Sequence, residues 1–155
     1  MTRIRPATSA DAAALAALRW EFRAGRERAA EAEAAFLDRC SAWMRHELGA
    51  AGAWRAWVVD DNGAIVGQVW LRVIEKVPNP VGERDRHAYL SNLYVRASAR
   101  GGAGTRLLET VLDWAAGHGV DRVVLWPTPR SVGLYERYGF VRSGDVMEKR
   151  CVERA

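Results

Sequence analysis

The sequence of 155 residues is poor in the side chains that build disulfides and metal sites, with 2 cysteines and 3 histidines. Cys40 and Cys151 lie far apart and form no C-x-x-C pair, so we expect free, buried thiols rather than a disulfide. The histidines, His46, His87 and His118, have no metal-like spacing, and no metal is predicted. The chemistry of this chain is therefore expected to need neither a disulfide nor a metal ion.

The chain also lacks a long apolar run. Its N-terminal sequence, MTRIRPATSADAAAL, has no apolar signal core, and no charge-free stretch is long enough to cross a membrane. We therefore expect no membrane partner and a cytoplasmic location.

A concentrated basic patch is missing as well. The formal net charge is +4, and the arginines are scattered along the chain, which argues against a nucleic-acid partner. A polyanionic cofactor would explain part of the basic balance. With 49% apolar and 27% charged residues and no repeat or linker, the composition fits a single globular domain over residues 1–155. A homodimer is left open.

The most informative stretch is LSNLYVRASARGGAGTRLLETVLDWAAGHG. An apolar strand at residues 90–95 is followed by a basic, glycine-rich turn, and apolar residues then recur at helical spacing from Leu107. The turn consists of Arg100, Gly101, Gly102, Ala103, Gly104 and Thr105. The first turn of a helix has unpaired N–H donors and a partial positive charge, and glycine lets a phosphate approach closely. We therefore predict a phosphate-binding loop, with close contact and a positive φ at Gly104.

Two familiar phosphate motifs are excluded. A P-loop needs a lysine after its last glycine, and a dinucleotide fold needs G-x-G-x-x-G with an acid on the next strand. Neither pattern is present in the chain. A plain strand-to-helix connection is the alternative that the glycine turn alone leaves open.

A second block, LYERYGF at residues 134–140, favours the phosphate-binding interpretation. The two blocks together resemble the GNAT superfamily of acyl-CoA-dependent N-acetyltransferases. Its pyrophosphate loop is written Arg/Gln-x-x-Gly-x-Gly/Ala after a valine-ended strand, and its later block is Leu-Tyr-x-x-x-Gly-Phe. The opening IRPAT and the strand IVG at residues 65–67 are also similar to that family. One departure is that the arginine position of the loop falls on Ala99, with Arg100 one residue late.

The order of expected elements defines the fold class. Two helices follow a short first strand, an antiparallel run comes next, and one β-α-β crossover leads to a short helix and a final strand pair from Phe140. The expected strands cover residues 4–6, 55–60, 64–75, 88–95 and 120–126, with Asn62-Gly63 as a hairpin turn. This order predicts an α/β (α+β mixed) fold with a mostly antiparallel sheet and helices on both faces. The resemblance implies that the two parallel strands splay apart to form an acyl-CoA cleft.

The resemblance also implies a function and the residues that perform it. The chain is expected to move an acetyl group from acetyl-CoA directly to a primary amine of a small molecule or peptide. Residues 100–105 would hold the pyrophosphate, and backbone groups in Leu93-Tyr94-Val95 would polarise the acyl carbonyl. Tyr135 matches the family's general acid. Ser131 would either bond the pantetheine arm or cap a helix.

Two other functions compete with this one. A protein-directed enzyme would acetylate an N-terminus or a lysine and would need an open groove. A non-catalytic acyl-CoA-binding module is favoured only by the absence of a carboxylate on the strand before the loop.

That absence leaves the proton acceptor open. Many family members carry a glutamate on this strand, but residues 88–93 of this chain contain no acid. Glu75, at the end of the adjacent strand, is the first candidate, and His87 is the second because of its suitable pKa. Water held by Ser91 and Asn92 is the third. The tryptophans are expected to be mostly core, with Trp70 or Trp126 as a wall for the acceptor.

Overall fold

The computed structural model describes residues 1–49 and 53–152. The chain divides into two compact units, Met1–Leu125 and Trp126–Ala155, and each is described by itself. Cys40 and Cys151 are free thiols, but Cys40 is half-buried and Cys151 is exposed, so the expectation that both are buried is wrong. Within the described residues, no helix combines the length and the apolar character that a membrane crossing requires.

The first unit contains a five-stranded sheet in the order β1-β2-β3-β4-β5. All neighbouring strands are antiparallel except β4 and β5, which are parallel. The strands are β1 (Thr2–Pro6), β2 (Trp54–Asp61), β3 (Ala64–Glu75), β4 (Arg86–Val95) and β5 (Arg122–Val124). The mostly antiparallel sheet that the sequence predicts is therefore confirmed.

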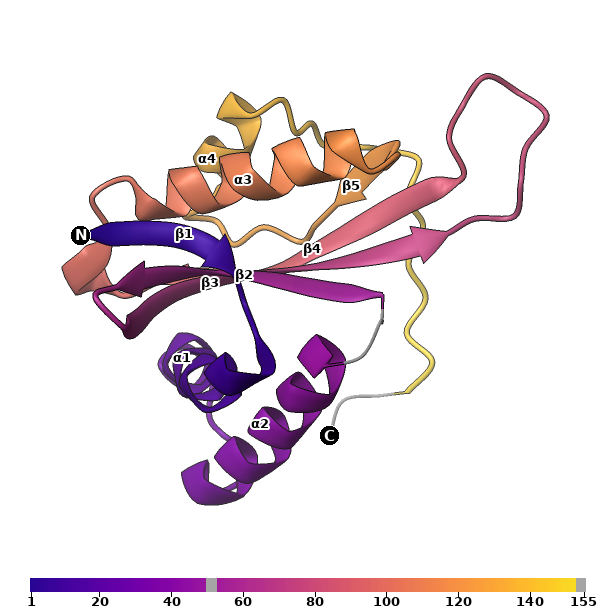
Figure 1. The fold of residues 1–155 in the computed structure, drawn as a ribbon. Coiled ribbons are helices and arrows are strands. Elements are labelled where there is room, and N and C mark those ends of the chain that lie inside the picture. Colours follow the sequence, from indigo (N-terminus) through magenta and orange to yellow (C-terminus); the bar gives the residue numbers. More distant parts are fainter. Residues whose placement is uncertain (50–52, 153–155) are drawn as a thin grey trace. The chain divides into compact units, whose positions relative to one another are not determined.

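Helices cover both faces of this sheet (Figure 1). Helices α1 (Ala12–Ala24) and α2 (Glu33–Gly49) lie against one face, and α3 (Ala103–Gly117) lies against the other. Short 3-10 turns precede α1 (η1, Ser9–Asp11) and the loop before α3 (η2, Ala97–Ala99). Since α3 joins the parallel strands β4 and β5, it is the helix of the predicted β-α-β crossover.

The face of α3 that meets the sheet is the apolar stripe predicted from the sequence. Leu107, Leu108 and Val111 recur at helical spacing and are fully buried. At Gly67 of β3 the sheet leaves no room for a side chain, because an added Cβ would lie 2.8 Å from Val59 Cγ2 and 2.9 Å from Val95 Cγ2. This glycine therefore allows β3 to pass between β2 and β4 beneath α3.

A buried hydrogen-bond chain joins α1 to β3. The amide of Gln68 is fully buried and donates to the Leu15 carbonyl oxygen at 3.1 Å. Its own oxygen accepts from Trp70 Nε1 at 2.9 Å. Both polar ends of this core glutamine are thus satisfied, which removes the cost of burying them.

The second unit contains one helix, α4 (Val132–Arg137), preceded by a turn at residues 128–131. The ring of Tyr135 packs against Phe140 with centroids 5.4 Å apart. The expected strand over residues 120–126 is shorter than predicted, since β5 covers only Arg122–Val124. The expected strand pair from Phe140 onward is not formed within residues 140–152, the part of that segment that the structure describes.

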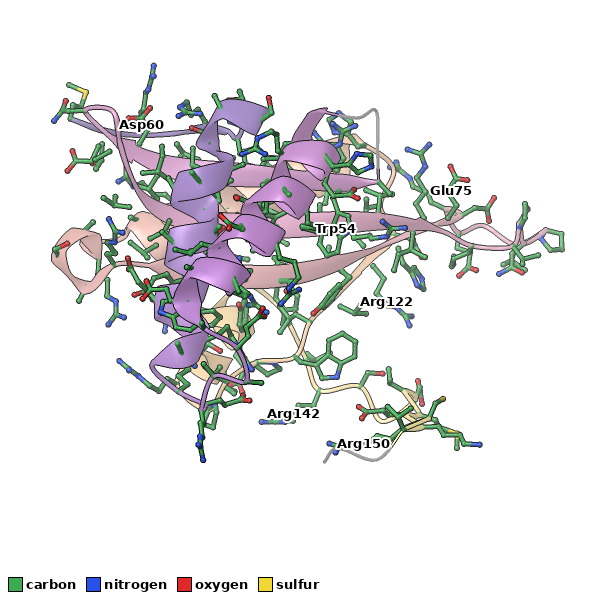
Figure 2. All side chains as sticks on the ribbon, turned by 90° about the horizontal axis from the view of Figure 1, so that it is seen from below. Trp54, Asp60, Glu75, Arg122, Arg142 and Arg150 are labelled. Atoms are coloured by element: carbon green, nitrogen blue, oxygen red, sulfur yellow. The ribbon has the colours of Figure 1, made fainter. Side chains whose placement is uncertain are left out.

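An ion network around Asp60, which Figure 2 labels, fixes β1 to β2 at the edge of the sheet. Asp60 Oδ2 accepts from Arg5 Nε at 2.8 Å and from Arg3 Nη2 at 3.3 Å, while Asp60 Oδ1 accepts from the Gly63 N–H at 2.8 Å. The guanidinium of Arg5 also binds both oxygens of Asp11 at 2.9 Å. The bond from Arg5, followed by that from Gly63, lowers the pKa of Asp60 to about 2.

This shift predicts a loss of stability in acid. The folded pKa of Asp60 lies below its ordinary value of 3.8, so its contribution is complete above that value and falls away as the pH drops toward about 2. We expect Asp60→Asn to lower the melting temperature at neutral pH. In this acid range, its melting temperature should change less with pH than that of the wild type. Asp61→Asn is the matched control, because Asp61 accepts only a 3.4 Å bond from Asn62. Equal acid sensitivity in the Asp60 variant and the wild type would contradict the assignment.

Candidate active site

Strand β4 contains a bulge in the middle of the candidate site. Ser91 pairs with Trp70 and Tyr94 with Gln68, so two residues of β4, Asn92 and Leu93, lie opposite a single residue of β3. Asn92 adopts a left-handed conformation, with φ of 59°. Bulges of this kind bend a strand and redirect its side chains and backbone groups.

Beyond the bulge, β5 no longer pairs with β4, so one edge of β4 has no strand beside it. The β4–β5 register contains His87↔Arg122, Ala88↔Val123 and Tyr89↔Val124, and it ends there. On the β3 side, the Arg96 N–H donates to the Val66 carbonyl oxygen at 2.9 Å. Because successive residues direct their backbone groups to opposite edges, the N–H and C=O of Val95 face the side that β5 leaves.

The predicted phosphate loop, residues 100–105, follows this strand end after Arg96 and the 3-10 turn η2. Gly102 is the N-cap of α3 and has a left-handed φ of 83°. Ala103 N–H donates to the Arg100 carbonyl oxygen at 2.9 Å, and Arg106 N–H to that of Gly102 at 3.1 Å. In the part of the chain that the structure describes, the N–H groups of Gly102, Gly104 and Thr105 donate no backbone hydrogen bond. The loop therefore presents free donors at a helix N-terminus, where an anion is favoured.

The positive φ is at Gly102 and not at Gly104, which corrects the prediction from the sequence. Gly104 lies within the first turn of α3 and has ordinary helical geometry. The nearest atom to a Cβ added there would be Val95 Cγ2 at 3.9 Å, an ordinary contact. The glycine that the backbone requires is the one that turns the chain into the helix.

Arg100 contributes to the site through the strand end. Its Nε donates to the Val95 carbonyl oxygen at 3.3 Å. The side chain thus turns back from the loop toward β4 and joins the two. No acidic residue occupies positions 100–108, so the surroundings of the free N–H groups remain cationic.

The two residues expected from the second motif lie in the second unit. The Tyr135 side chain is buried, and this burial raises its pKa to about 12. Its phenol is therefore fully protonated at neutral pH. Ser131 Oγ donates to the Thr128 carbonyl oxygen at 3.0 Å and accepts from the Thr128 N–H at 2.9 Å, so it closes the turn before α4.

Glu75 and His87 lie at the end of β3 and the start of β4, away from the end of β4 that leads to the loop. Figure 2 labels Glu75 there. Glu75 is paired in register with Arg86 at the start of β4, and its carboxylate lies 3.9 Å from the Arg86 guanidinium. At about 3.3 Å per residue, Arg86 and Leu93 are roughly 20 Å apart along the strand. Burial, with Lys76 and Arg122, lowers the pKa of His87. The structure does not bring either group to the end of β4 that precedes the loop.

A set of polar contacts at the bulge was not predicted from the sequence. Arg19 of α1 donates from Nη1 to Asn92 Oδ1 at 3.3 Å, and the Tyr89 hydroxyl donates to Ser91 Oγ at 3.3 Å. Asn92, one of the two residues of the third proton-acceptor candidate, therefore contacts Arg19. In the sequence, only the polar Ser91-Asn92 pair within the mostly apolar residues 88–95 pointed to polar contacts here.

Comparison with known proteins agrees with this geometry. Residues 13–140 match the model of the acetyltransferase (GNAT) family. The chain therefore belongs to the GNAT family and is an acyl-CoA-dependent N-acyltransferase of the acetyltransferase type. Among curated proteins, none matches this chain in sequence.

Solved structures are similar over nearly the whole chain. A GCN5-related N-acetyltransferase from Ralstonia eutropha is 27% identical, with 98% of this chain and 100% of that one covered and a TM-score of 0.80. A predicted acetyltransferase with acetyl-CoA from Clostridium acetobutylicum is 20% identical, with 97% and 96% covered and a TM-score of 0.78. Glucosamine-6-phosphate N-acetyltransferase from Arabidopsis thaliana is 17% identical, with 98% and 99% covered and a TM-score of 0.72. The last two structures, at 20% and 17% identity, show that the fold is shared and no more than that.

The family uses acetyl-CoA as its acyl donor, and residues 100–105 stay the predicted binding site for its pyrophosphate. Cβ atoms built at Gly101 and Gly102 would meet nothing within 4 Å, so the space above these residues is open to a ligand. The unpaired N–H groups of the first turn of α3 supply donors for phosphate oxygens. Among the described residues, no group of three or more His, Cys, Asp or Glu side chains is placed to hold a metal ion.

These observations predict separate effects on stability and on binding. Gly104→Val puts a branched side chain beside the free N–H groups, and we expect it to weaken acetyl-CoA binding by about tenfold or more, equivalent to about 1.4 kcal/mol. The melting temperature should be kept, because the backbone there is helical and the only near neighbour is Val95. Titration calorimetry with acetyl-CoA measures the effect.

The matched control is Gly117→Val in the last turn of the same helix, where an added Cβ would meet nothing within 4 Å. This variant should bind acetyl-CoA as the wild type does. Unchanged affinity in a folded Gly104→Val protein would show that the loop does not hold the pyrophosphate.

Proposed function

We propose that this chain transfers the acetyl group of acetyl-CoA directly to a primary amine of a small molecule or peptide. One observation carries the proposal: three features follow one another along the chain. They are the end of β4 that β5 does not pair with, the left-handed Gly102, and the N-terminus of α3 with its free N–H groups. The strand edge and the loop present backbone N–H groups in series along one segment. Acetyl-CoA supplies an acetyl group activated as a thioester.

The end of β4 is proposed to polarise the acyl carbonyl. The Val95 N–H faces the edge that β5 leaves, and Leu93 lies in the bulge just before it. A backbone N–H held rigidly by a sheet donates without reorganisation to an oxygen that gains negative charge, which is a large catalytic contribution. The bond from Arg100 to the Val95 carbonyl oxygen fixes the orientation of this peptide segment.

For the amine proton, we propose water held by Ser91 and Asn92 ahead of Glu75 and His87. Ser91 and Asn92 lie at the bulge itself, whereas the other two lie at the far end of β4 and β3. A lysine-like amine has a pKa of about 10.4 and must lose a proton before it attacks. The hydroxyl of Ser91 and the amide of Asn92 can orient a water molecule that passes this proton to solvent.

The decisive experiment is turnover of acetyl-CoA against a panel of small amines and short peptides, followed by thiol release and by mass spectrometry of the products. An acetylated amine with one thiol released per product supports the proposal. Binding of acetyl-CoA without product from any amine would instead favour a non-catalytic acyl-CoA-binding module. Acetylation confined to a folded protein would favour the protein-directed alternative.

Tyr135 is proposed as the general acid that protonates the leaving thiolate. Tyr135→Phe keeps the ring contact with Phe140 and removes only the hydroxyl. Loss of one positioned proton donor typically lowers the rate by about a hundredfold to ten-thousandfold, so kcat should fall by that factor. Acetyl-CoA affinity and the melting temperature should stay near those of the wild type. Tyr138→Phe is the control, and normal turnover by the Tyr135 variant would make this tyrosine a packing residue.

The pH–rate profile separates the three proton acceptors. We expect kcat/KM to rise with pH along one limb that reports the amine, and this limb should persist in Glu75→Gln and in His87→Ala. If His87 were the base, the limb would lie below the ordinary histidine pKa of 6.5, because the pKa of His87 is lowered. Loss of the limb in His87→Ala, or in Glu75→Gln, would overturn the water proposal in favour of that residue.

A further inference from the structure

Arg19 is a cation at the candidate site that forms no ion pair with any residue of the described chain, 1–49 and 53–152. It lies on α1, with its guanidinium against Asn92 of the β4 bulge and close to Cys40 of α2 and Tyr89 of β4. Burial lowers its pKa, and the charge of Arg23 adds to this effect. Keeping a guanidinium partly out of water has a free-energy cost that an anion would offset.

Some other arginines of the same unit have carboxylate partners, whereas Arg55 and Arg72 lie over aromatic rings. Arg5 binds Asp11 and Asp60, Arg23 binds Glu27, and Arg96 binds Glu21. Within residues 1–49 and 53–125, the described part of the first unit, no carboxylate lies within ion-pair distance of Arg19.

Aromatic rings lie beside this cation on the same face of the sheet. Trp54 of β2, Arg72 of β3 and Tyr89 of β4 are directly opposite one another in the register. The rings of Trp54 and Tyr89 are 6.1 Å apart, and Trp43 of α2 lies 5.8 Å from Trp54. Figure 2 shows Trp54 beside α2, on the face that the two helices cover.

The Trp43 side chain is 44% exposed. The aromatic cluster, Trp43, Trp54 and Tyr89, therefore offers apolar surface next to two cations, Arg19 and Arg72.

We propose that the acceptor of this enzyme is a small amine that carries a carboxylate close to its amino group, such as an α-amino acid with an apolar side chain. This inference rests on the proposed function. Arg19 would bind the carboxylate, and the aromatic cluster would receive the apolar group. Asn92 links the two parts of the proposed site. It contacts Arg19, and it is next in sequence to Leu93, a residue proposed to act on the acyl carbonyl, so the bound carboxylate would lie close to the reacting amine.

The reaction leaves the carboxylate unchanged. The amine nitrogen forms a bond to the acetyl carbon as the carbon–sulfur bond breaks. The amine proton passes through water to solvent, Tyr135 gives its proton to the leaving thiolate, and solvent returns a proton to Tyr135. Arg19 takes no part in this proton transfer, and its charge is constant during the reaction. Its role is to select and position the acceptor.

The test compares amino acids with their carboxamides, which keep the shape and remove the charge. Phenylalanine and phenylalaninamide, with leucine and leucinamide as a second pair, are titrated by calorimetry into the protein saturated with CoA. The comparison is made at equal fractions of unprotonated amine. Since hydrogen bonds to charged groups are the stronger class, the wild type should bind each acid at least about tenfold more tightly than its amide.

Arg19→Gln should reduce this preference to near unity, and Arg19→Lys should keep part of it. Arg23→Gln is the matched control on the same helix, because Arg23 is ion-paired with Glu27 at 2.6 Å, and it should keep the full preference. A wild type that binds acid and amide equally overturns the proposal even if the Arg19 variants do not fold. A folded Arg19→Gln protein with the wild-type preference also overturns it.

Turnover of the same pairs separates this inference from the function on which it rests. If the acids bind more tightly than the amides but no acetylated product forms, the proposed ligand class stands and the proposed acetyl transfer is contradicted. Acetylation of the amides at the same kcat/KM as the acids would retain acetyl transfer and contradict the ligand class.

Discussion

The unequal pairing of β4 on its two edges is the constraint on which the rest of the candidate site depends. β3 pairs with β4 from Glu75↔Arg86 to Gly67↔Val95, whereas β5 pairs with only three of its residues. A strand held along one edge is rigid, and the part of its other edge that has no neighbour keeps backbone donors and acceptors for a ligand. The same end of β4 leads through the short turn η2 into the predicted phosphate loop, so the strand edge and the helix N-terminus are fixed by one packed core.

Two glycines make this arrangement possible, for different physical reasons. Gly67 is required by space, since Val59 and Val95 fill the position of its missing side chain. Gly102 is required by conformation, since its left-handed φ turns the chain into α3. The sequence predicted a glycine loop before a helix, but the spacing of the glycines cannot tell a left-handed residue from a helical one. The positive φ was therefore assigned to Gly104, two residues too late.

Local patterns predicted local structure well, because the period of apolar residues reports the face that a helix or strand buries. The buried stripe of α3 at Leu107, Leu108 and Val111 and the Asn62-Gly63 hairpin are examples. The contact of Arg19 with Asn92 joins residues 73 positions apart, and the bulge that permits it depends on how β3 and β4 register. Such contacts have no periodic signal. The strand pair expected after residue 140 likewise needs partners that its own sequence does not specify.

In the proposed mechanism, one strand serves both substrates through different parts of its structure. The acyl donor meets the backbone edge of β4 and the loop N–H groups, which any sequence with the same fold provides. The acceptor meets side chains on the face of the sheet, including Asn92, and side chains of α1 and α2 that pack over it. Changes at Arg19 or Trp43 can therefore alter the acceptor without disturbing donor binding. This separation gives a physical reason why one fold accommodates acetyltransferases with different amines, and why the acceptor of each must be argued from its own side chains.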